Sequence, residues 1–161
     1  MDEQLDKVRA VLEGYIVMLY QQAKDTEDRY MQFLIDSNKG RLWKEKNNLA
    51  YRVRQKNNTL MLEWYQIVWK TVARTERESE LHYIRKRNKN KRGTDKVYGY
   101  ELRDILKYAP DRDHERVLEV EAEAKTFRRQ AHYCASMLVI LGRLTRYLTE
   151  LDGEQVAGDA A

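Results

Sequence analysis

Two groups of cationic side chains carry the clearest chemical signal in the sequence. In the first group, Arg52, Arg54 and Lys56 alternate with a two-residue period. In the second, six of the eight residues from Arg85 to Arg92 are basic, namely Arg85, Lys86, Arg87, Lys89, Lys91 and Arg92. Cationic side chains that stand clear of a core can contact phosphate, so both groups are candidate nucleic-acid contacts. An arginine on a two-stranded ribbon can also bond two guanine acceptors in the major groove.

A solvated face is the alternative interpretation of each group, and it weighs about equally for the alternating row. In the hairpin described below, Arg52 lies opposite Glu63, so a cross-strand ion pair would account for it. The denser run repels itself, which favours an anionic partner. Nearby aromatic residues could stack on exposed bases of a single strand: Tyr65, Tyr83, Tyr98 and Tyr100. Neither pattern separates DNA from RNA.

Catalytic and metal-binding motifs are scarce. The chain has no glycine-rich phosphate loop, nucleophile elbow, paired cysteine motif or HExxH. The densest cluster of possible ligands is Asp111, Asp113, His114 and Glu115, a composition that is also typical of a helix start and is better explained by capping. A small nuclease using this cluster is a minor alternative. We expect no enzyme, no metal and no cofactor.

Composition bounds the class of protein. With 161 residues, one cysteine, one proline and seven glycines, the chain predicts a single helix-rich domain without an internal disulfide. Its acidic, polar start is unlike a signal peptide, and no stretch is apolar enough for a membrane, so a cytoplasmic protein is expected. The net charge of +4 is unevenly distributed, because residues 41–98 hold 16 basic against six acidic side chains, or +10.

Two long helices should frame the chain. Apolar residues at helical spacing predict a helix over residues 3–37, and Gly40 can cap it in the left-handed conformation. Further helices are expected over 99–109 and 113–151, followed by a disordered tail over 152–161. The last helix has a coiled-coil-like seam from Val117 to Leu148. It should pack on the N-terminal helix, on a second copy, or on both, and a homodimer is expected.

Between the helices the apolar period changes to two residues, which predicts strands over about 47–56 and 59–69 around an Asn57-Asn58 turn. Opposed residue numbers then sum to 115, so Val53 faces Leu62 and Tyr51 faces Trp64 on the core side. The segment LHYIRK should add a third strand, giving a small antiparallel sheet within 45–87, and 88–97 should be a basic loop. Glu119, Glu121 and Glu123 are assigned to a solvated face, where they could equally meet a basic partner. Cys134 is assigned to the apolar seam. The predicted class is α+β.

The order of these features resembles a known family. It comprises the hairpin LAYRVRQKNNTLMLEWYQIVW, then HYIRK, a basic loop that closes on GYELRDILKYA, and HERVLEVEAEAKTFRRQA in the long helix. Over roughly residues 45 to 150 the chain is similar to the MobI-like auxiliary mobilisation proteins of conjugative plasmids and integrative conjugative elements.

The resemblance implies a non-enzymatic component of the relaxosome that acts at the origin of transfer. It would bind double-stranded DNA there and help a separate relaxase to engage it. A different class of function remains open, in which the long helices form an interaction or adaptor surface and the basic segment is merely solvated.

Overall fold

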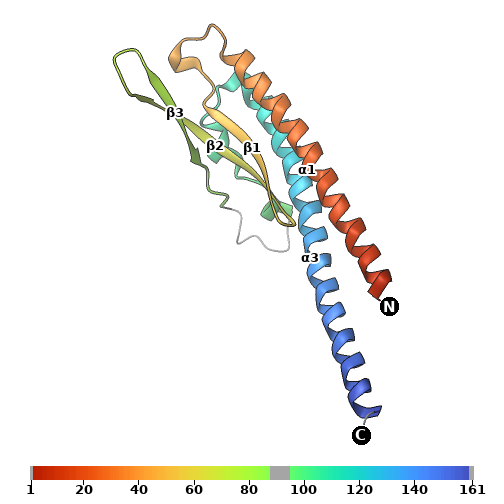
Figure 1. Ribbon diagram of the computed structural model, residues 1–161. Helices are drawn as coiled ribbons and strands as arrows, with labels where there is room; N and C mark the ends of the chain where they lie inside the picture. Colours follow the sequence, from red (N-terminus) through yellow and green to blue (C-terminus); the bar gives the residue numbers. More distant parts are fainter. Residues whose placement is uncertain (1, 88–94, 160–161) are drawn as a thin grey trace.

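The computed structural model describes residues 2–87 and 95–159, which form two long helices and a small sheet (Figure 1). The helices are α1 (Asp2–Asn38), the short α2 (Leu102–Leu106) and α3 (His114–Asp159), and the strands are β1 (Leu49–Lys56), β2 (Thr59–Thr71) and β3 (Arg77–Tyr83). Short 3-10 turns occur at η1 (Trp43–Glu45), η3 (Asp95–Tyr98) and η4 (Asp111–Asp113). The predicted α+β class is confirmed. In the part of the chain that is described, no helix is long and apolar enough to cross a membrane.

The β1–β2 hairpin has the predicted register. Val53 pairs with Leu62 and Tyr51 with Trp64. Asn57 has a positive φ of 53°, which asparagine tolerates better than most residues. The predicted Asn57-Asn58 turn is therefore present, and it fixes the register of the two strands. The sheet order is β1-β2-β3, with both pairings antiparallel.

One hydrophobic core lies between the inner face of the sheet and the α1/α3 pair. Tyr51 and Trp64 are fully buried, and their rings contact the buried ring of Tyr30 from α1 at 6.4 and 5.1 Å between centroids. The Tyr30 hydroxyl donates a hydrogen bond to the Leu49 carbonyl oxygen at 2.9 Å. Cys134 is 5% exposed within the same core, which confirms its assignment to the apolar seam.

A buried ion pair joins α3 to the sheet. The Arg128 guanidinium binds both carboxylate oxygens of Glu121 at 2.9 and 3.1 Å, and the two side chains are only 7% and 5% exposed. Glu121 also accepts hydrogen bonds from the Trp64 indole at 2.7 Å and from the Tyr100 backbone N–H at 2.8 Å. The assignment of Glu121 to a solvated face was therefore wrong. Its charge is tolerated inside because four donors surround it.

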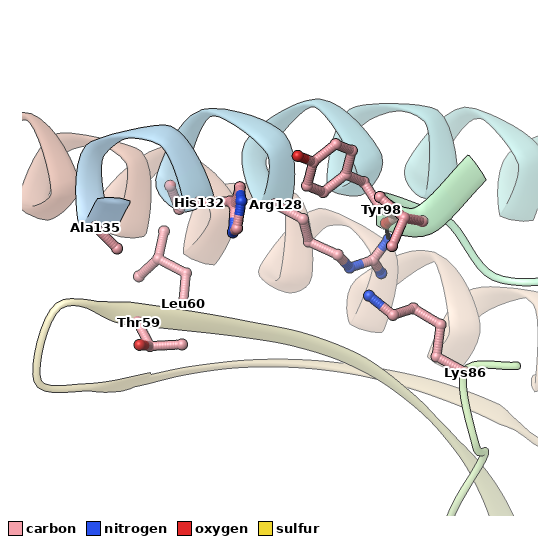
Figure 2. Close-up of a pocket in the computed structure, with 9 residues that line it drawn as sticks. Thr59, Leu60, Lys86, Tyr98, Arg128, His132 and Ala135 are labelled. Atoms are coloured by element: carbon pink, nitrogen blue, oxygen red, sulfur yellow. Dashed lines mark hydrogen bonds between the residues drawn. The ribbon is translucent and has the colours of Figure 1, made fainter. Parts of the chain in front are cut away.

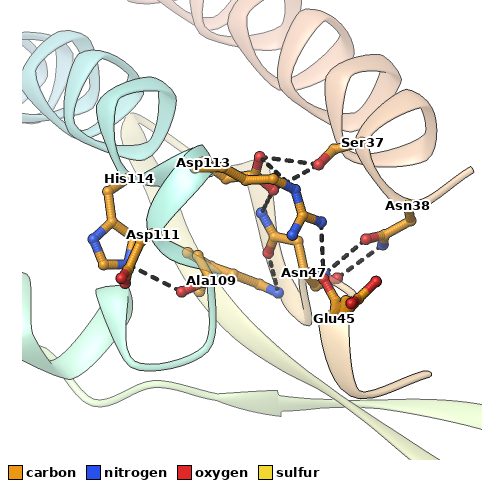
Figure 3. Close-up of polar contacts among 10 residues, drawn as sticks. Ser37, Asn38, Glu45, Asn47, Ala109, Asp111, Asp113 and His114 are labelled. Carbon is orange, nitrogen blue, oxygen red and sulfur yellow. Dashed lines mark hydrogen bonds and ion pairs between the residues drawn. The ribbon is translucent and has the colours of Figure 1, made fainter. Parts of the chain in front are cut away.

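A second polar network ties the end of α1 to the start of α3 (Figure 3). The carboxylate of Asp113 accepts hydrogen bonds from the Ser37 hydroxyl at 2.7 and 2.9 Å and from the Asn47 side-chain amide at 2.9 Å. Asn47 in turn exchanges two hydrogen bonds with the side chain of Asn38. Three segments that lie far apart in the sequence are thereby held at one end of the helical pair.

Three predicted boundaries differ from the structure. The third strand is β3, at 77–83, and not the segment 81–86, because polar residues such as Glu78 and Glu80 pair with an extended β2 that runs to Thr71. The short helix covers only Leu102–Leu106 of the expected 99–109, since the Tyr100 N–H is bonded to Glu121 and not within a helix. α3 continues to Asp159, where a disordered tail was expected from 152. Most of the predicted basic loop, at 88–94, lies outside the described residues.

Candidate nucleic-acid interface

The sheet has an outer face that points away from α1 and α3, and the alternating cations lie on it. Strand alternation puts Arg52, Arg54 and Lys56 of β1 on this face, whereas Tyr51 and Val53 of the same strand are buried on the inner face. The outer face also carries side chains of β2 and β3, namely Met61, Glu63, Tyr65, Trp69, Leu81 and Tyr83. In Figure 1 both long helices lie on the other side of the sheet.

One of the three cations is neutralised within the sheet. A guanidinium nitrogen of Arg54 lies 2.6 Å from Glu63 and donates to the Tyr65 hydroxyl at 3.0 Å. The Tyr65 hydroxyl in turn donates to Glu63 at 2.8 Å. The hydrogen bond to Glu63 raises the pKa of Arg54, and burial followed by the bond to Glu63 raises the pKa of Tyr65. The ion pair therefore forms with Arg54, on the diagonal, and not with Arg52 as the pairing opposite Glu63 suggested.

The other two cations keep their charge available. Both Arg52 and Lys56 are exposed, and among the described residues neither forms an ion pair. The Arg52 guanidinium lies 5.9 Å from the centroid of the Tyr65 ring, which orients it without neutralising it. Cations held over a flat sheet in this way can contact the phosphate oxygens of a polyanion.

Exposed aromatic side chains border these cations toward β3 and the link before β1. Tyr83 is 51% exposed and stacks edge-on against Tyr65 at 5.8 Å. Farther along the sheet, Trp43 and Trp69 contact each other at 5.3 Å between ring centroids, and the Arg77 guanidinium lies 4.3 Å from the Trp43 ring. Tyr100, in contrast, is only 6% exposed. Of the aromatics considered for stacking, Tyr83 is the most accessible, whereas Tyr100 belongs to the core.

Of the second cationic group, the structure describes Arg85, Lys86 and Arg87, which follow the end of β3. Arg87 forms an ion pair with Asp104, next to α2, at 3.2 Å. Arg85, which is exposed, lines a small pocket of about 160 Å³ with residues of the sheet and α2. The members Lys89, Lys91 and Arg92 lie outside the described residues. Of the described members, Arg87 is neutralised, whereas Arg85 keeps an exposed side chain close to Tyr83 of the outer face.

Lys86 lines a larger pocket, of about 500 Å³, between the tip of the hairpin and α3 (Figure 2). Figure 2 shows its ammonium group directed toward Arg128, with Tyr98 and His132 on the helix side of the same space. The lining residues come from four segments far apart in the sequence, so no local pattern could have revealed the pocket. Its most buried cation, Arg128, is already held by Glu121.

The cluster at the start of α3 serves the fold. Asp113 is 3% exposed and accepts its hydrogen bonds from α1 and the link before β1, as described above. The ring of His114 bonds to the backbone carbonyls of Leu106 and Ala109 at 3.2 and 3.0 Å (Figure 3). Among the described residues, no three histidine, cysteine or carboxylate side chains are grouped so that they could hold a metal ion.

Comparison with known protein families finds a match to this chain. The family model described as MobI protein matches residues 19–142, which is most of the chain and includes the whole sheet. Neither the curated proteins nor the solved structures contain a match. The matched region takes in both the outer face and the buried Glu121–Arg128 pair. The chain therefore belongs to the MobI family and is a mobilisation-related accessory protein.

Proposed function

We propose that this protein is a non-enzymatic, cytoplasmic DNA-binding accessory factor that recognises double-stranded DNA at an origin of transfer and assists a relaxase there. The observation that carries the proposal is the outer face of the sheet, where Arg52 and Lys56 are exposed and have no ion-pair partner among the described residues. An accessory role in mobilisation requires contact with DNA or with a protein already on it, and this face suits the first.

Charge supports a phosphate ligand in particular. Residues 41–98, which contain the whole sheet, carry a net charge of +10. The acidic side chain nearest to the alternating row, Glu63, is already bound to Arg54 and Tyr65. The field above the outer face is therefore set by the remaining cations, which would draw a polyanion toward this side of the molecule.

Shape supports a duplex over a single strand. The β1–β2 hairpin is a two-stranded antiparallel ribbon whose tip is the Asn57-Asn58 turn, and a ribbon of this kind fits the major groove. Arg52 lies in the middle of β1 and Lys56 at the end next to the turn. We assign Arg52 to the reading of base edges or phosphate and Lys56 to phosphate. A single strand would instead need a row of exposed aromatic rings, of which Tyr83 is the main one beside these cations.

The test is selection of bound fragments from random DNA and from DNA of a source element, at near-physiological salt. The proposal predicts enrichment of one site, and binding to that site should weaken on the order of tenfold, about 1.4 kcal/mol, in the double variant Arg52→Ala, Lys56→Ala. Both side chains are exposed, so the variant should keep the helical signal and the unfolding midpoint of the parent protein.

A matched control removes the same number of charges elsewhere. Lys7→Ala with Arg143→Ala changes exposed cations on α1 and α3, away from the sheet. This control should bind the selected duplex as tightly as the parent protein. If both double variants weaken binding equally, the outer face does not bind the DNA specifically. If no fragment is enriched in the selection, the adaptor function becomes the better account.

A further inference from the structure

Half of the α1/α3 pair projects beyond the sheet and carries exposed apolar side chains on both helices (Figure 1). All of the following are at least 38% exposed: Val8, Val11, Tyr15 and Met18 of α1, and Tyr133, Met137, Ile140, Leu144, Tyr147 and Leu151 of α3. On α3 they recur at 133, 137, 140, 144, 147 and 151, in alternating steps of four and three. That spacing forms a second apolar stripe beside the buried seam.

The exposed residues of the two helices lie on the same side of the pair. The helices are antiparallel, because Ser37 bonds to Asp113 while Thr26 bonds to Glu123. On one flank Arg29 forms an ion pair with Glu123 at 3.2 Å. Residues seven apart in a supercoiled helix return to the same face, so this flank can be followed along both helices.

Following the flank shows a change from charged to apolar residues. Two heptads from the Arg29–Glu123 pair it presents Tyr15 and Met137, and three heptads away it presents Val8 and Leu144. The sheet covers the opposite flank, since Glu27 of α1 accepts the Val53 N–H and Arg128 of α3 donates to the Leu62 carbonyl. The apolar residues thus form one continuous surface, which we call the stem face, on the side of the pair away from the sheet.

The size of the stem face matches a stable protein interface. From the exposed fractions, its side chains present roughly 1,000 Å², against about 800 Å² that each partner contributes to an interface of standard size. An apolar surface of this extent is unusual on a monomer and marks an association site.

We propose that a second copy of this chain covers the stem face, so that the two α1/α3 pairs form an antiparallel four-helix bundle. A twofold axis parallel to the helices lays α1 of each copy on α3 of the other and leaves every helix antiparallel to its neighbours. The most exposed stem-face residues fit this arrangement. Val11 of α1 and Ile140 of α3 are level with each other along the pair and would face each other between copies.

The first experiment is sedimentation of the full chain without DNA over a range of protein concentrations. The parent protein should sediment with twice the mass of one chain. The double variant Val11→Glu, Ile140→Glu should sediment as a monomer with unchanged helical content, because these side chains are 72% and 62% exposed and support nothing within one copy.

A matched control places the same charges on equally exposed apolar residues outside the stem face. Ile35 is 61% and Val72 is 58% exposed, so Ile35→Glu with Val72→Glu should remain dimeric. A monomeric parent protein, or a stem-face variant that remains dimeric, would overturn the proposal. DNA is absent from this experiment, so its result does not depend on the proposed function of the sheet.

Disulfide trapping tests the occupant and its direction, in a Cys134→Ala background. The double variant Val11→Cys, Ile140→Cys should form a crosslinked dimer on mild oxidation, whereas Val11→Cys alone should not. Crosslinking of the single variant would mean that α1 lies on α1 of the partner, which contradicts the proposed axis. The buried position of Cys134, at 5% exposure, makes its removal a change inside the core, so the background is first checked for an unchanged sedimentation pattern.

Discussion

The two faces of one small sheet treat charge in opposite ways. On the inner face, the Glu121 and Arg128 side chains are almost fully buried, and each is bound by the other and by further hydrogen-bond partners. On the outer face, Arg54 is neutralised by Glu63, while Arg52 and Lys56 form no ion pair with any described residue. Buried charge must be paired to be tolerated, whereas exposed charge costs the fold little. The unpaired cations are therefore the ones that the fold leaves available for a ligand.

Breaking the inner pair should give the largest effect on stability. Glu121→Ala leaves the buried Arg128 guanidinium without its carboxylate and removes the acceptor of the Trp64 indole. We expect a loss of about 3–5 kcal/mol in the free energy of unfolding, measured by urea denaturation. A loss comparable to that of an exposed ion pair, under about 1 kcal/mol, would show that the two faces do not differ as described.

Alkaline pH should cause the next largest loss of stability, because buried tyrosines of the core would have to ionise. Burial is the main cause that raises the pKa of Tyr30, Tyr51 and Tyr100 above the ordinary value of 10.0. The neutral phenol is thus favoured in the folded state, so stability is fully present below pH 10 and falls as the pH rises above it. At pH 11 each buried tyrosine should cost about 1.4 kcal/mol. Phenolate absorbance and circular dichroism, followed together, should show these rings ionising only as the protein unfolds.

The turn that assigns side chains to the two faces should give a smaller effect. Asn57 has a φ of 53°, in the left-handed region. A β-branched residue in this conformation raises the free energy of the folded state by about 1–2 kcal/mol. Asn57→Val should lower the free energy of unfolding by that amount, measured in urea, whereas Asn57→Gly should leave it unchanged or slightly higher. Equal stability of the two variants would contradict the role given to this turn.

The outer ion pair should matter least for folding. Arg54→Ala removes an exposed contact with Glu63, so the urea midpoint should stay close to that of the parent protein. DNA binding should also fall less than in the double variant Arg52→Ala, Lys56→Ala, because Arg54 is already occupied. A larger loss of affinity in Arg54→Ala than in that double variant would reverse the assignment of the free cations.

The hairpin and the two long helices could be predicted from the sequence, because each depends on residues close together in the chain. Once Asn57 and Asn58 were taken as the turn, the register of β1 and β2 followed, and with it the inner and outer faces. The long helices followed from apolar spacing, and Gly40 does adopt the expected positive φ, at 70°. These features depend on residues close to one another in the chain.

The predictions that were wrong concern residues whose environment is set by partners far away in the sequence. Glu121 was assigned to a solvated face together with Glu119 and Glu123, yet it is buried and bound by Trp64, Tyr100 and Arg128. β3 contains the polar run from Arg77 to Glu80, which is extended only because β2 continues beside it. The Arg54–Glu63 contact is diagonal, and strand alternation alone predicts only which residues lie directly opposite.

The most direct test of the function is the salt dependence of binding to the selected duplex, measured by fluorescence anisotropy. Each phosphate contact that is lost reduces the slope of log K against log salt by about 0.9. The account predicts that Arg52→Ala, Lys56→Ala lowers the slope by about 1.8 if both cations contact phosphate, or by about 0.9 if Arg52 reads a base edge. The control Lys7→Ala, Arg143→Ala should leave the slope unchanged. A slope identical in the parent protein and the outer-face variant would contradict the claim that this face holds the DNA.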